Sequence, residues 1–252
     1  MKVFVLLTCY EDLDLWGNCL FYDSIRNSFP DDEIYVYDNA SEPQYSSIFK
    51  ERTKQIDAEY QLIPFRCSLS DFVLKLIDQE VEPFYLVDPD TIWFDPLIQH
   101  YDAAIAGRFM PKFYNFYGGT NELPRIHTCC MFIDPIRCRS IMESSIHDDR
   151  LIHASVFSWN HMNYKLDTFS LFYILYPDQC VIFSDDESRK FAHLFCGTHI
   201  SQVKNSIPEL LELHKMIQSN SISPEELDDI HNDYFNQFAW KEDVRMPPFY
   251  KE

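Results

Sequence analysis

Two aspartates two positions apart, Asp88 and Asp90, are the residues of this chain best suited to hold a divalent cation. They directly follow the apolar run Phe84 to Val87, and Pro89 restricts the backbone between them. Mg²⁺ and Mn²⁺ favour oxygen ligands, commonly one or two carboxylates completed by phosphate oxygens and water. Asp-Pro-Asp is also common in turns, so the alternative is that both side chains only cap a turn. The triplet therefore indicates a metal and phosphate site if a strand of a parallel sheet precedes it.

The segments before the triplet alternate between short apolar runs and stretches with helical spacing. We expect strands over 3–8, 34–37, 60–63 and 84–87, and helices over 13–28, 44–57 and 70–80. This alternation is typical of βαβ units, which form an α/β fold with a mostly parallel central sheet and helices on both faces. Ligands bind such sheets at the carboxyl ends of the strands, which is where Asp88 and Asp90 fall.

The second half of the chain has weaker periodicity. We expect strands over 103–109 and 125–133, helices over 136–145 and 168–176, and a return to the core over 191–200. Between the two strands, residues 110–124 are expected to be an aromatic loop that walls an acceptor site. Ser-x-x-Glu capping signals at Ser206 and Ser223 predict two helices in a C-terminal helical extension over 206–252.

The composition argues against several classes of function. Forty acidic residues against 21 Lys and Arg give a net charge of −19, which disfavours a nucleic acid partner because phosphate binding needs clustered basic side chains. Only 5 glycines occur, and neither G-x-G-x-x-G nor G-x-x-x-x-G-K-[ST] is present. The absence of both motifs argues against Rossmann dehydrogenases and P-loop enzymes. An acidic protein that binds a phosphorylated ligand needs a local positive charge, most simply a divalent cation.

The pattern of cysteines and the short lengths of the apolar runs predict a cytoplasmic chain. None of the 8 cysteines forms C-x-x-C, and most, including Cys129 and Cys130, lie in apolar runs, so we expect free, buried thiols in a reducing compartment. The run Val3 to Leu7 is too short for a signal peptide, and no run approaches the roughly 20 apolar residues of a membrane-spanning helix.

Two motifs resemble those of nucleotide-sugar glycosyltransferases of the A fold. Asp88-Pro89-Asp90 is similar to their D-x-D motif, and Asp38-Asn39-Ala40-Ser41 is similar to the D-N-x-S segment that contacts the nucleoside. The resemblance implies a Rossmann-like catalytic domain over 1–205, Mn²⁺ or Mg²⁺ as cofactor, and a nucleoside-diphosphate sugar as donor, with a UDP-sugar favoured. It also implies contacts to the nucleotide from a set of residues in the first, second and fourth βα segments: Thr8, Cys9, Tyr10, Asp38 and Asp88.

A late histidine near a glycine completes the metal sphere in many members of that family, and the segment from Phe191 to His199 is similar. The resemblance implies His193 as a ligand beside Asp88 and Asp90, with His199 as the second choice, because neutral imidazole can join carboxylates on Mn²⁺. The alternative is a core histidine with satisfied hydrogen bonds. The Lys-Pro-Trp that follows the glycine in some retaining members is absent, so the stereochemistry is left open.

Asp167 resembles in position the general base of inverting members, which lies near the start of a helix that faces the acceptor. If the reaction inverts, Asp167 takes the proton of the acceptor hydroxyl; if it retains, Asp167 positions the acceptor. The alternative is a helix N-cap. Asp134 and Asp178 are lower choices, since both adjoin prolines in expected turns, and Arg125 and His127 flank a strand from which they could reach phosphate or acceptor.

We therefore expect a metal-dependent glycosyltransferase that moves a sugar to a hydroxyl of a saccharide, a lipid-linked saccharide or a small molecule. Two other classes stay open. A nucleotidyltransferase could use paired carboxylates at a sheet edge in a similar way, and a catalytically silent scaffold could use its two tail helices as an interaction surface.

Overall fold

The structure, a computed structural model, describes all residues except 98–99, 116–118, 195–197, 199–200, 202–207 and 231–252. The chain divides into two compact units, which we describe one at a time. Unit 1 comprises Met1–Arg66, Tyr85–Gln99 and Ser184–Asp233. Unit 2 comprises Cys67–Phe84, His100–Phe183 and Tyr234–Glu252.

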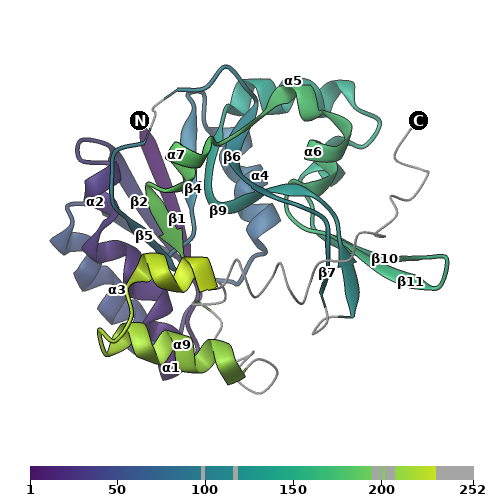
Figure 1. The fold of residues 1–252 in the computed structure, drawn as a ribbon. Helices are drawn as coiled ribbons and strands as arrows, with labels where there is room; N and C mark the ends of the chain where they lie inside the picture. The colour runs from purple at the N-terminus through teal and green to yellow at the C-terminus, as the bar shows by residue number, and fades with distance from the viewer. Residues whose placement is uncertain (98–99, 116–118, 195–197, 199–200, 202–207, 231–252) are drawn as a thin grey trace. The chain divides into compact units, whose positions relative to one another are not determined.

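Unit 1 contains the strands and helices that begin the chain and two segments that return to it. Its strands are β1 (Lys2–Leu7), β2 (Glu33–Asn39), β3 (Glu59–Ile63), β5 (Thr91–Trp93), β13 (Phe191–His193) and all but the first residue of β4 (Phe84–Val87). Its helices are α1 (Asp12–Leu15), the 3₁₀ helix η1 (Gly17–Asp23), α2 (Ile25–Ser28), α3 (Pro43–Gln55), α7 (Asp185–Ser188) and α9 (Pro208–Gln218). Figure 1 shows β1 and β2 side by side.

Unit 2 is built from the middle of the chain. Its strands are β6 (Ile105–Met110), β7 (Phe113–Asn115), β8 (Thr120–Glu122), β9 (Arg125–Ile133), β10 (Ser155–Trp159), β11 (Met162–Leu166) and β12 (Cys180–Ile182). Its helices are α4 (Leu69–Gln79), α5 (Pro135–Ser144), η2 (Asp148–Leu151), α6 (Ser170–Leu175) and η3 (Pro177–Gln179).

The expected α/β architecture is confirmed. The described strands form a seven-stranded sheet in the order β12-β6-β9-β4-β1-β2-β3, a four-stranded sheet in the order β10-β11-β8-β7, and the β13-β5 pair. In the largest sheet β1 pairs parallel with β2, β2 with β3, and β12 with β6, whereas β9 runs antiparallel to β6. The sheet is therefore mostly parallel, with β9 reversed relative to β6.

The core strands of unit 1 are apolar for the reason the sequence suggests. All four residues of β4 are buried, and β1 is buried at Val3, Phe4, Val5 and Leu7. A strand covered on both faces cannot keep polar side chains, so it has a continuous apolar run and no alternation. The parallel register places Leu7 beside Asp38, so the loops after β1 and β2 leave the sheet at the same edge.

The helix expected over 13–28 is wrong as a single element. The chain instead forms α1, η1 and α2 in succession. The side-chain amide of Asn18 donates to the carbonyl of Asp14 and accepts from the backbone N–H of Thr8, and the N–H of Phe21 donates to the carbonyl of Pro89. The bonds to Thr8 and Pro89 join this stretch to other segments, and the Asn18 side chain bonds the Asp14 carbonyl that its own N–H would use in a continuous helix, which is how short polar side chains interrupt helices.

The C-terminal helices pack within unit 1. Leu194, Ile217 and Leu227 form a buried apolar cluster, against which Trp16 and Leu20 of the first helical segment also pack. Figure 1 accordingly shows α9 next to α1. The capping box at Ser223 is confirmed, since Ser223 and Glu226 exchange side-chain to backbone hydrogen bonds at the start of a helix over 224–230. The capping signal at Ser206 and the domain boundary between 205 and 206 lie outside the described residues and stay predictions.

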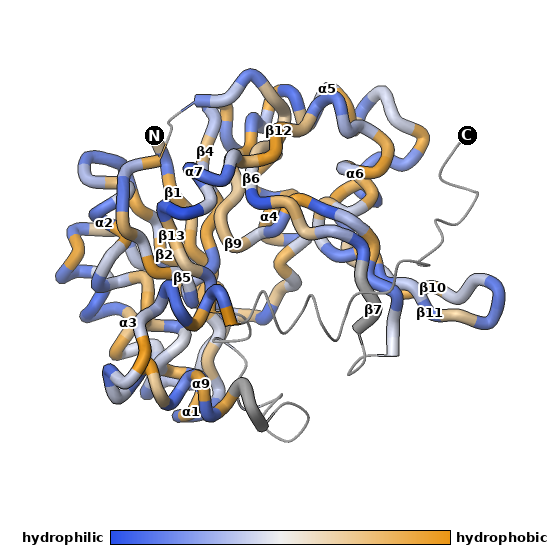
Figure 2. The backbone as a smooth tube through the Cα atoms, in the orientation of Figure 1, coloured by the Kyte–Doolittle hydropathy of each residue, from blue (hydrophilic) through white to orange (hydrophobic). Residues whose placement is uncertain are grey.

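The loop expected over 110–124 is wrong in part, because it contains β7 and β8. Sequence analysis also missed the hairpin of β10 and β11, in which Trp159 pairs with Met162. Its two turn residues, Asn160 and His161, have φ of 48° and 63°. Positive φ at both positions is typical of the tight type I′ turn, which is easily recognised when glycine is second but not when histidine is. Figure 2 shows the hydrophilic tip of this hairpin in blue.

The expectation of buried thiols is confirmed at Cys129 and Cys130, which have no exposed surface in β9. The other strands and helices expected from the sequence are present within a few residues of their predicted ends; α6, for example, spans only 170–175 of the expected 168–176. Among the described residues, no helix combines the length and the apolar character needed to cross a membrane.

Candidate metal and nucleotide site

Asp88, Asp90 and His193 form a cluster within unit 1. The two aspartates follow β4, and His193 is the last residue of β13, where it pairs with Thr91 of β5. His193 Nε2 lies 3.3 Å from Asp90 Oδ1 and 3.9 Å from Asp88 Oδ2. Asp90 is buried, while Asp88 and His193 are partly exposed. The structure thus brings together the three residues predicted as metal ligands, and the second choice, His199, lies outside the described residues.

The donor set fits a hard divalent cation. One ligand atom from each residue lies within 4.8 Å of the others. Ligands at about 2.1 Å in an octahedron are roughly 3 Å apart when adjacent and roughly 4 Å apart when opposite. The two measured separations fall in that range, the two carboxylates are the ligand type that Mg²⁺ and Mn²⁺ favour, and a neutral imidazole can join them on Mn²⁺. Their role as ligands stays a prediction.

Two described residues that follow β13, Leu194 and Thr198, are bonded to the cluster. The backbone N–H of Leu194 donates to the carbonyl of Asp90, and that of Thr198 donates to Asp90 Oδ2 at 3.3 Å. Oδ2 accepts the bond from Thr198, while the other carboxylate oxygen, Oδ1, faces His193 Nε2 at 3.3 Å. The N–H of His193 itself donates to Asp228 Oδ1 at 3.1 Å, from the helix over 224–230. Sequence analysis missed Asp228 because nothing local marks a helical aspartate as a partner of a distant strand.

The predicted nucleoside contact Asp38 lies at the carboxyl end of β2 and has no exposed surface. Its two carboxylate oxygens accept hydrogen bonds from the Tyr60 hydroxyl at 2.7 Å and from the Ser41 N–H at 3.0 Å. Burial, followed by the hydrogen bond to Asp38 and the Asp38 charge, raises the pKa of Tyr60, so its hydroxyl stays a donor. Ala40, inside this turn, has φ of 56°, a conformation that non-glycine residues adopt at a cost. In this structure Asp38 shapes the turn.

The loop after β1 is tied to the same turn. The N–H of Cys9 donates to Ser41 Oγ, its carbonyl accepts from the Glu42 N–H, and Thr8 Oγ1 accepts from the Asn39 amide. The Cys9 side chain is buried, and desolvation, followed by the charge of Asp14, raises the thiol pKa to about 12. It is therefore a neutral packing group. The Cys9 bonds to residues 41 and 42 fix the path of the loop.

Tyr10 is the exposed member of the predicted nucleotide contacts. Its side chain is 37% accessible, and the guanidinium of Arg66 lies 5.3 Å from the centre of its ring. A cation over an aromatic face is a favourable pair, and the opposite face of such a ring can stack on a base. Sequence analysis did not single out Arg66 or Tyr60, both of which lie on or after β3.

In unit 2 the predicted catalytic residue Asp167 belongs to a charge network. Asp167 Oδ2 lies 3.1 Å from Arg125 Nη2 and 3.7 Å from Lys165 Nζ. Arg125 and Lys165 also each lie 3.7 Å from the buried Glu122 carboxylate. Burial would raise the pKa of Asp167, but Arg125 and Lys165 outweigh it, and the pKa is lowered. The carboxylate is therefore held ionised.

The N-cap interpretation of Asp167 is wrong. The N-cap of α6 is Phe169, with φ of 65°, while Asp167 Oδ1 accepts the N–H of its neighbour Thr168. Of the lower choices, Asp134 caps α5 by accepting from the N–H groups of Ile136 and Arg137. Asp178 lies in η3.

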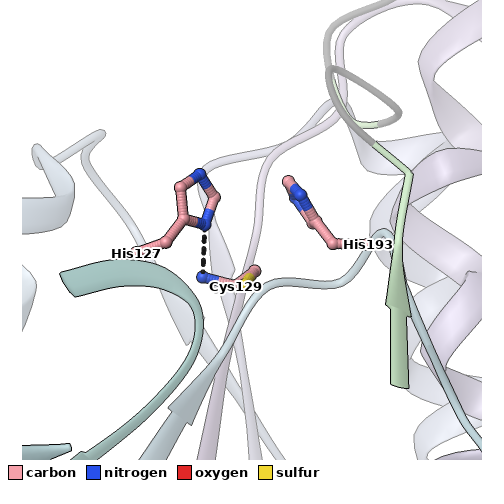
Figure 3. Close-up of side chains that lie close together, drawn as sticks. All are labelled: His127, Cys129 and His193. Carbon is pink, nitrogen blue, oxygen red and sulfur yellow. Dashed lines mark hydrogen bonds between the residues drawn. The ribbon is translucent and has the colours of Figure 1, made fainter. Parts of the chain in front are cut away.

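His127, which the sequence analysis named together with Arg125, lies in β9 and is held by a local hydrogen bond. Its Nδ1 accepts the backbone N–H of Cys129 at 3.0 Å, as the dashed line in Figure 3 shows. This bond fixes Nδ1 as the acceptor, so any proton on a neutral ring is on Nε2.

Comparisons with known proteins yield fold likenesses only. No model of a known protein family matches the chain, and no curated protein sequence matches it. Glycosyltransferases are among the solved structures that it resembles. One is a mannosyltransferase from Pyrobaculum calidifontis in complex with GDP-mannose and Mn²⁺, with 14% identity over 73% of this chain and 55% of that one, at a TM-score of 0.41.

Two further structures illustrate the range of the likeness. The galactosyltransferase LgtC, in complex with donor and acceptor sugar analogues, shares 10% identity over 72% of this chain and 73% of its own, with a TM-score of 0.42. A nucleoside-diphosphate-sugar pyrophosphorylase from Vibrio cholerae shares 8% over 84% of this chain and 100% of its own, with a TM-score of 0.43. The chain spans about half or less of the first three structures, between 38% and 55%. We therefore argue function from the site itself.

Proposed function

We propose that this protein is a metal-dependent glycosyltransferase that moves a sugar from a nucleoside-diphosphate sugar, a UDP-sugar being favoured, to a hydroxyl of a saccharide, a lipid-linked saccharide or a small molecule. The cluster of Asp88, Asp90 and His193 carries the proposal. It lies after β4, which is next to β1 in the sheet, so the same edge offers both cation ligands and the tethered loops after β1 and β2. Such an edge is where α/β folds bind nucleotides.

Each residue has a role in this proposal. Asp90 Oδ1, Asp88 and neutral His193 would hold Mn²⁺ or Mg²⁺, and Asp88 would also lie next to the diphosphate. A cation bound there stabilises negative charge as it develops on the departing diphosphate. Because the chain carries a net charge of −19, binding the negatively charged diphosphate without a local positive charge would be costly.

The nucleoside would be bound by the loops after β1 and β2. Tyr10 offers an exposed ring, and Thr8 and Cys9 supply the backbone beside it, held at Ser41 and Glu42. Asp38 acts in this proposal by fixing the turn, because its side chain has no exposed surface and each carboxylate oxygen accepts a hydrogen bond within the protein.

Asp167 is the residue proposed to bind the acceptor hydroxyl. A lowered pKa makes a carboxylate a weaker base, so the ion pairs with Arg125 and Lys165 favour orienting the hydroxyl over removing its proton. The stereochemistry of the transfer is left to experiment.

The first experiment is a thermal-shift panel with UDP, GDP, CDP and dTDP, with and without Mn²⁺, on the wild type, Asp90→Asn and Asp186→Asn. Asp186 is a matched control because it is an exposed aspartate of α7. A ligand at 100 times its Kd stabilises the native state by roughly 2.7 kcal/mol. We expect one nucleotide to raise the Tm of the wild type and of Asp186→Asn only with Mn²⁺, and not to raise that of Asp90→Asn.

A product assay then separates the enzyme classes. With that nucleotide's sugar donor and Mn²⁺, we expect release of the nucleoside diphosphate by the wild type and loss of release in Asp90→Asn. Release of pyrophosphate from a nucleoside triphosphate and a sugar phosphate would show a nucleotidyltransferase instead. If no nucleotide changes the Tm, that result would contradict both the glycosyltransferase and the nucleotidyltransferase and would favour a scaffold.

A further inference from the structure

Asn18 is a buried polar residue outside the cluster of Asp88, Asp90 and His193. It lies in η1 and has no exposed surface. Its Oδ1 accepts the N–H of Thr8 at 3.1 Å, and its Nδ2 donates to the carbonyl of Asp14 at 2.9 Å and to that of Thr198 at 3.4 Å. Both amide hydrogens are thus used, and one side chain joins three segments of unit 1.

Asp14 supplies a second bond to the same distant segment. It is 5% exposed, and its two carboxylate oxygens accept from Ser201: the N–H at 2.7 Å and the hydroxyl at 2.5 Å. A carboxylate that accepts two hydrogen bonds from one residue fixes both its position and its orientation. Thr198 and Ser201 are therefore both held by residues that precede them by more than 170 positions.

The segment held in this way also contacts the proposed cation site. Thr198 donates its N–H to Asp90 Oδ2, while its carbonyl accepts from Asn18. Thr198 therefore lies between the Asn18 amide and the Asp90 carboxylate, bonded to both. The bond to Oδ2 constrains the rotation of the Asp90 carboxylate, and with it the direction of Oδ1 relative to His193.

We propose that Asn18, supported by Asp14, is a positioning residue for the cation: it holds Thr198, which orients the Asp90 carboxylate toward His193. Neither Asn18 nor Asp14 belongs to the cluster of ligands. The inference rests on the proposed function, because it assumes that the cluster binds a cation. Residues that orient metal ligands through hydrogen bonds commonly change affinity by about 10- to 100-fold when they are removed.

The bond from Asn18 to Thr8 gives the arrangement a second consequence. Thr8 begins the loop that carries Cys9 and Tyr10, so one amide side chain bonds both the proposed nucleoside loop and the segment that orients Asp90. The proposed donor site and cation site would then be linked through the Asn18 side chain. The diphosphate, which would contact both the nucleoside loop and the cation, would be a second link.

The test measures the Kd for Mn²⁺ alone, from the EPR signal of free Mn²⁺, with no nucleotide present. The proteins are the wild type, Asn18→Ala, Asn18→Asp, Ser201→Ala and Asn27→Ala. Asn27 is the matched control, because its side-chain amide also bonds a distant backbone carbonyl, that of Trp93, but has no bond to Thr198. The Tm of each variant is recorded, and binding is measured well below it.

We expect the Kd of Asn18→Ala to rise about tenfold or more, and that of Asn27→Ala to equal the wild-type value even if its Tm falls. Asn18→Asp keeps the volume and the acceptor for Thr8 but loses both donors, so its Kd should rise as in the alanine variant. It also serves where the alanine variant fails to fold. Ser201→Ala removes one of two bonds to Asp14, and its Kd should rise by a smaller factor.

Two results would overturn the inference, and they differ. If the wild type binds Mn²⁺ and the Asn18 variants bind it equally well with a lowered Tm, Asn18 has only a structural role and the proposed function stands. If the wild type itself binds no Mn²⁺, the cation site fails, and the positioning role fails with it.

Discussion

The Asp167 carboxylate shows how much a residue's chemistry depends on partners outside its own motif. Its neighbours in sequence suggest a helix cap, but Arg125 and Lys165 surround it with positive charge. A lone buried carboxylate would have a raised pKa, as a general base requires. Here the two cations reverse that effect.

Asp167→Asn tests this ion pairing. Since the folded pKa is lowered, the carboxylate contributes stability above its ordinary pKa of 3.8, and the contribution is lost as the pH falls through the folded value. We expect Asp167→Asn to reduce the free energy of unfolding by roughly 1–3 kcal/mol at pH 7, as for a charged hydrogen bond. The difference from the wild type should shrink below about pH 4. Urea unfolding at several pH values measures it, and a difference independent of pH would contradict the assignment.

At the scale of elements, the antiparallel pair β6 and β9 depends on one glycine. A Cβ on Gly107 would lie 2.6 Å from Ile126 Cγ2 and 2.8 Å from the carbonyl oxygen of Cys130. The pairing register also shifts between Gly107 and Phe109. The two backbones approach so closely there that no side chain fits without movement of β9.

Gly107→Ala is therefore expected to lower the free energy of unfolding by roughly 1–3 kcal/mol, the usual cost of overpacking. Gly119→Asn is the control: Gly119 has φ of +62°, which asparagine tolerates, and open space around its Cβ position. We expect the control to stay within about 0.5 kcal/mol of the wild type. Chemical denaturation of both compares them, and equal stabilities would show that β9 shifts at little cost.

For the whole molecule, the dominant physical fact is the excess of 19 negative charges. Mutual repulsion of like charges destabilises the compact state, and salt screens it over about 10 Å at 0.1 M. The same excess makes a bound cation more favourable and a polyanionic acceptor less so.

We expect the Tm to rise when monovalent salt is increased from about 20 mM to about 200 mM. Calorimetry in choline chloride measures this effect without a metal that could bind at Asp88 and Asp90, and NaCl provides the comparison. A Tm that stays constant or falls in both salts would show that local ion pairs, such as those of Arg125, outweigh the net repulsion.

The sequence by itself determined six of the described strands to within about two residues: β1 to β4, β6 and β9. Short apolar runs such as Phe84 to Val87 are typical of strands buried between helices, and polar residues that follow such strands fall at the carboxyl edge, which places Asp88 and Asp38 correctly. These conclusions need only local periodicity, because burial acts on each segment separately. The hairpin at Asn160-His161 was missed for a local reason: its turn lacks the usual glycine.

Only the tertiary structure decided which distant groups meet. That β13 pairs with β5, that Arg125 and Lys165 surround Asp167, and that Asn18 bonds Thr198 all depend on contacts across long stretches of chain. Hydrogen bonds and ion pairs are specific over a few ångströms, and many polar residues could satisfy each local pattern. Packing of the whole core selects among them, which is why the residue types could be chosen from sequence but most of their partners, apart from His193 beside Asp88 and Asp90, could not.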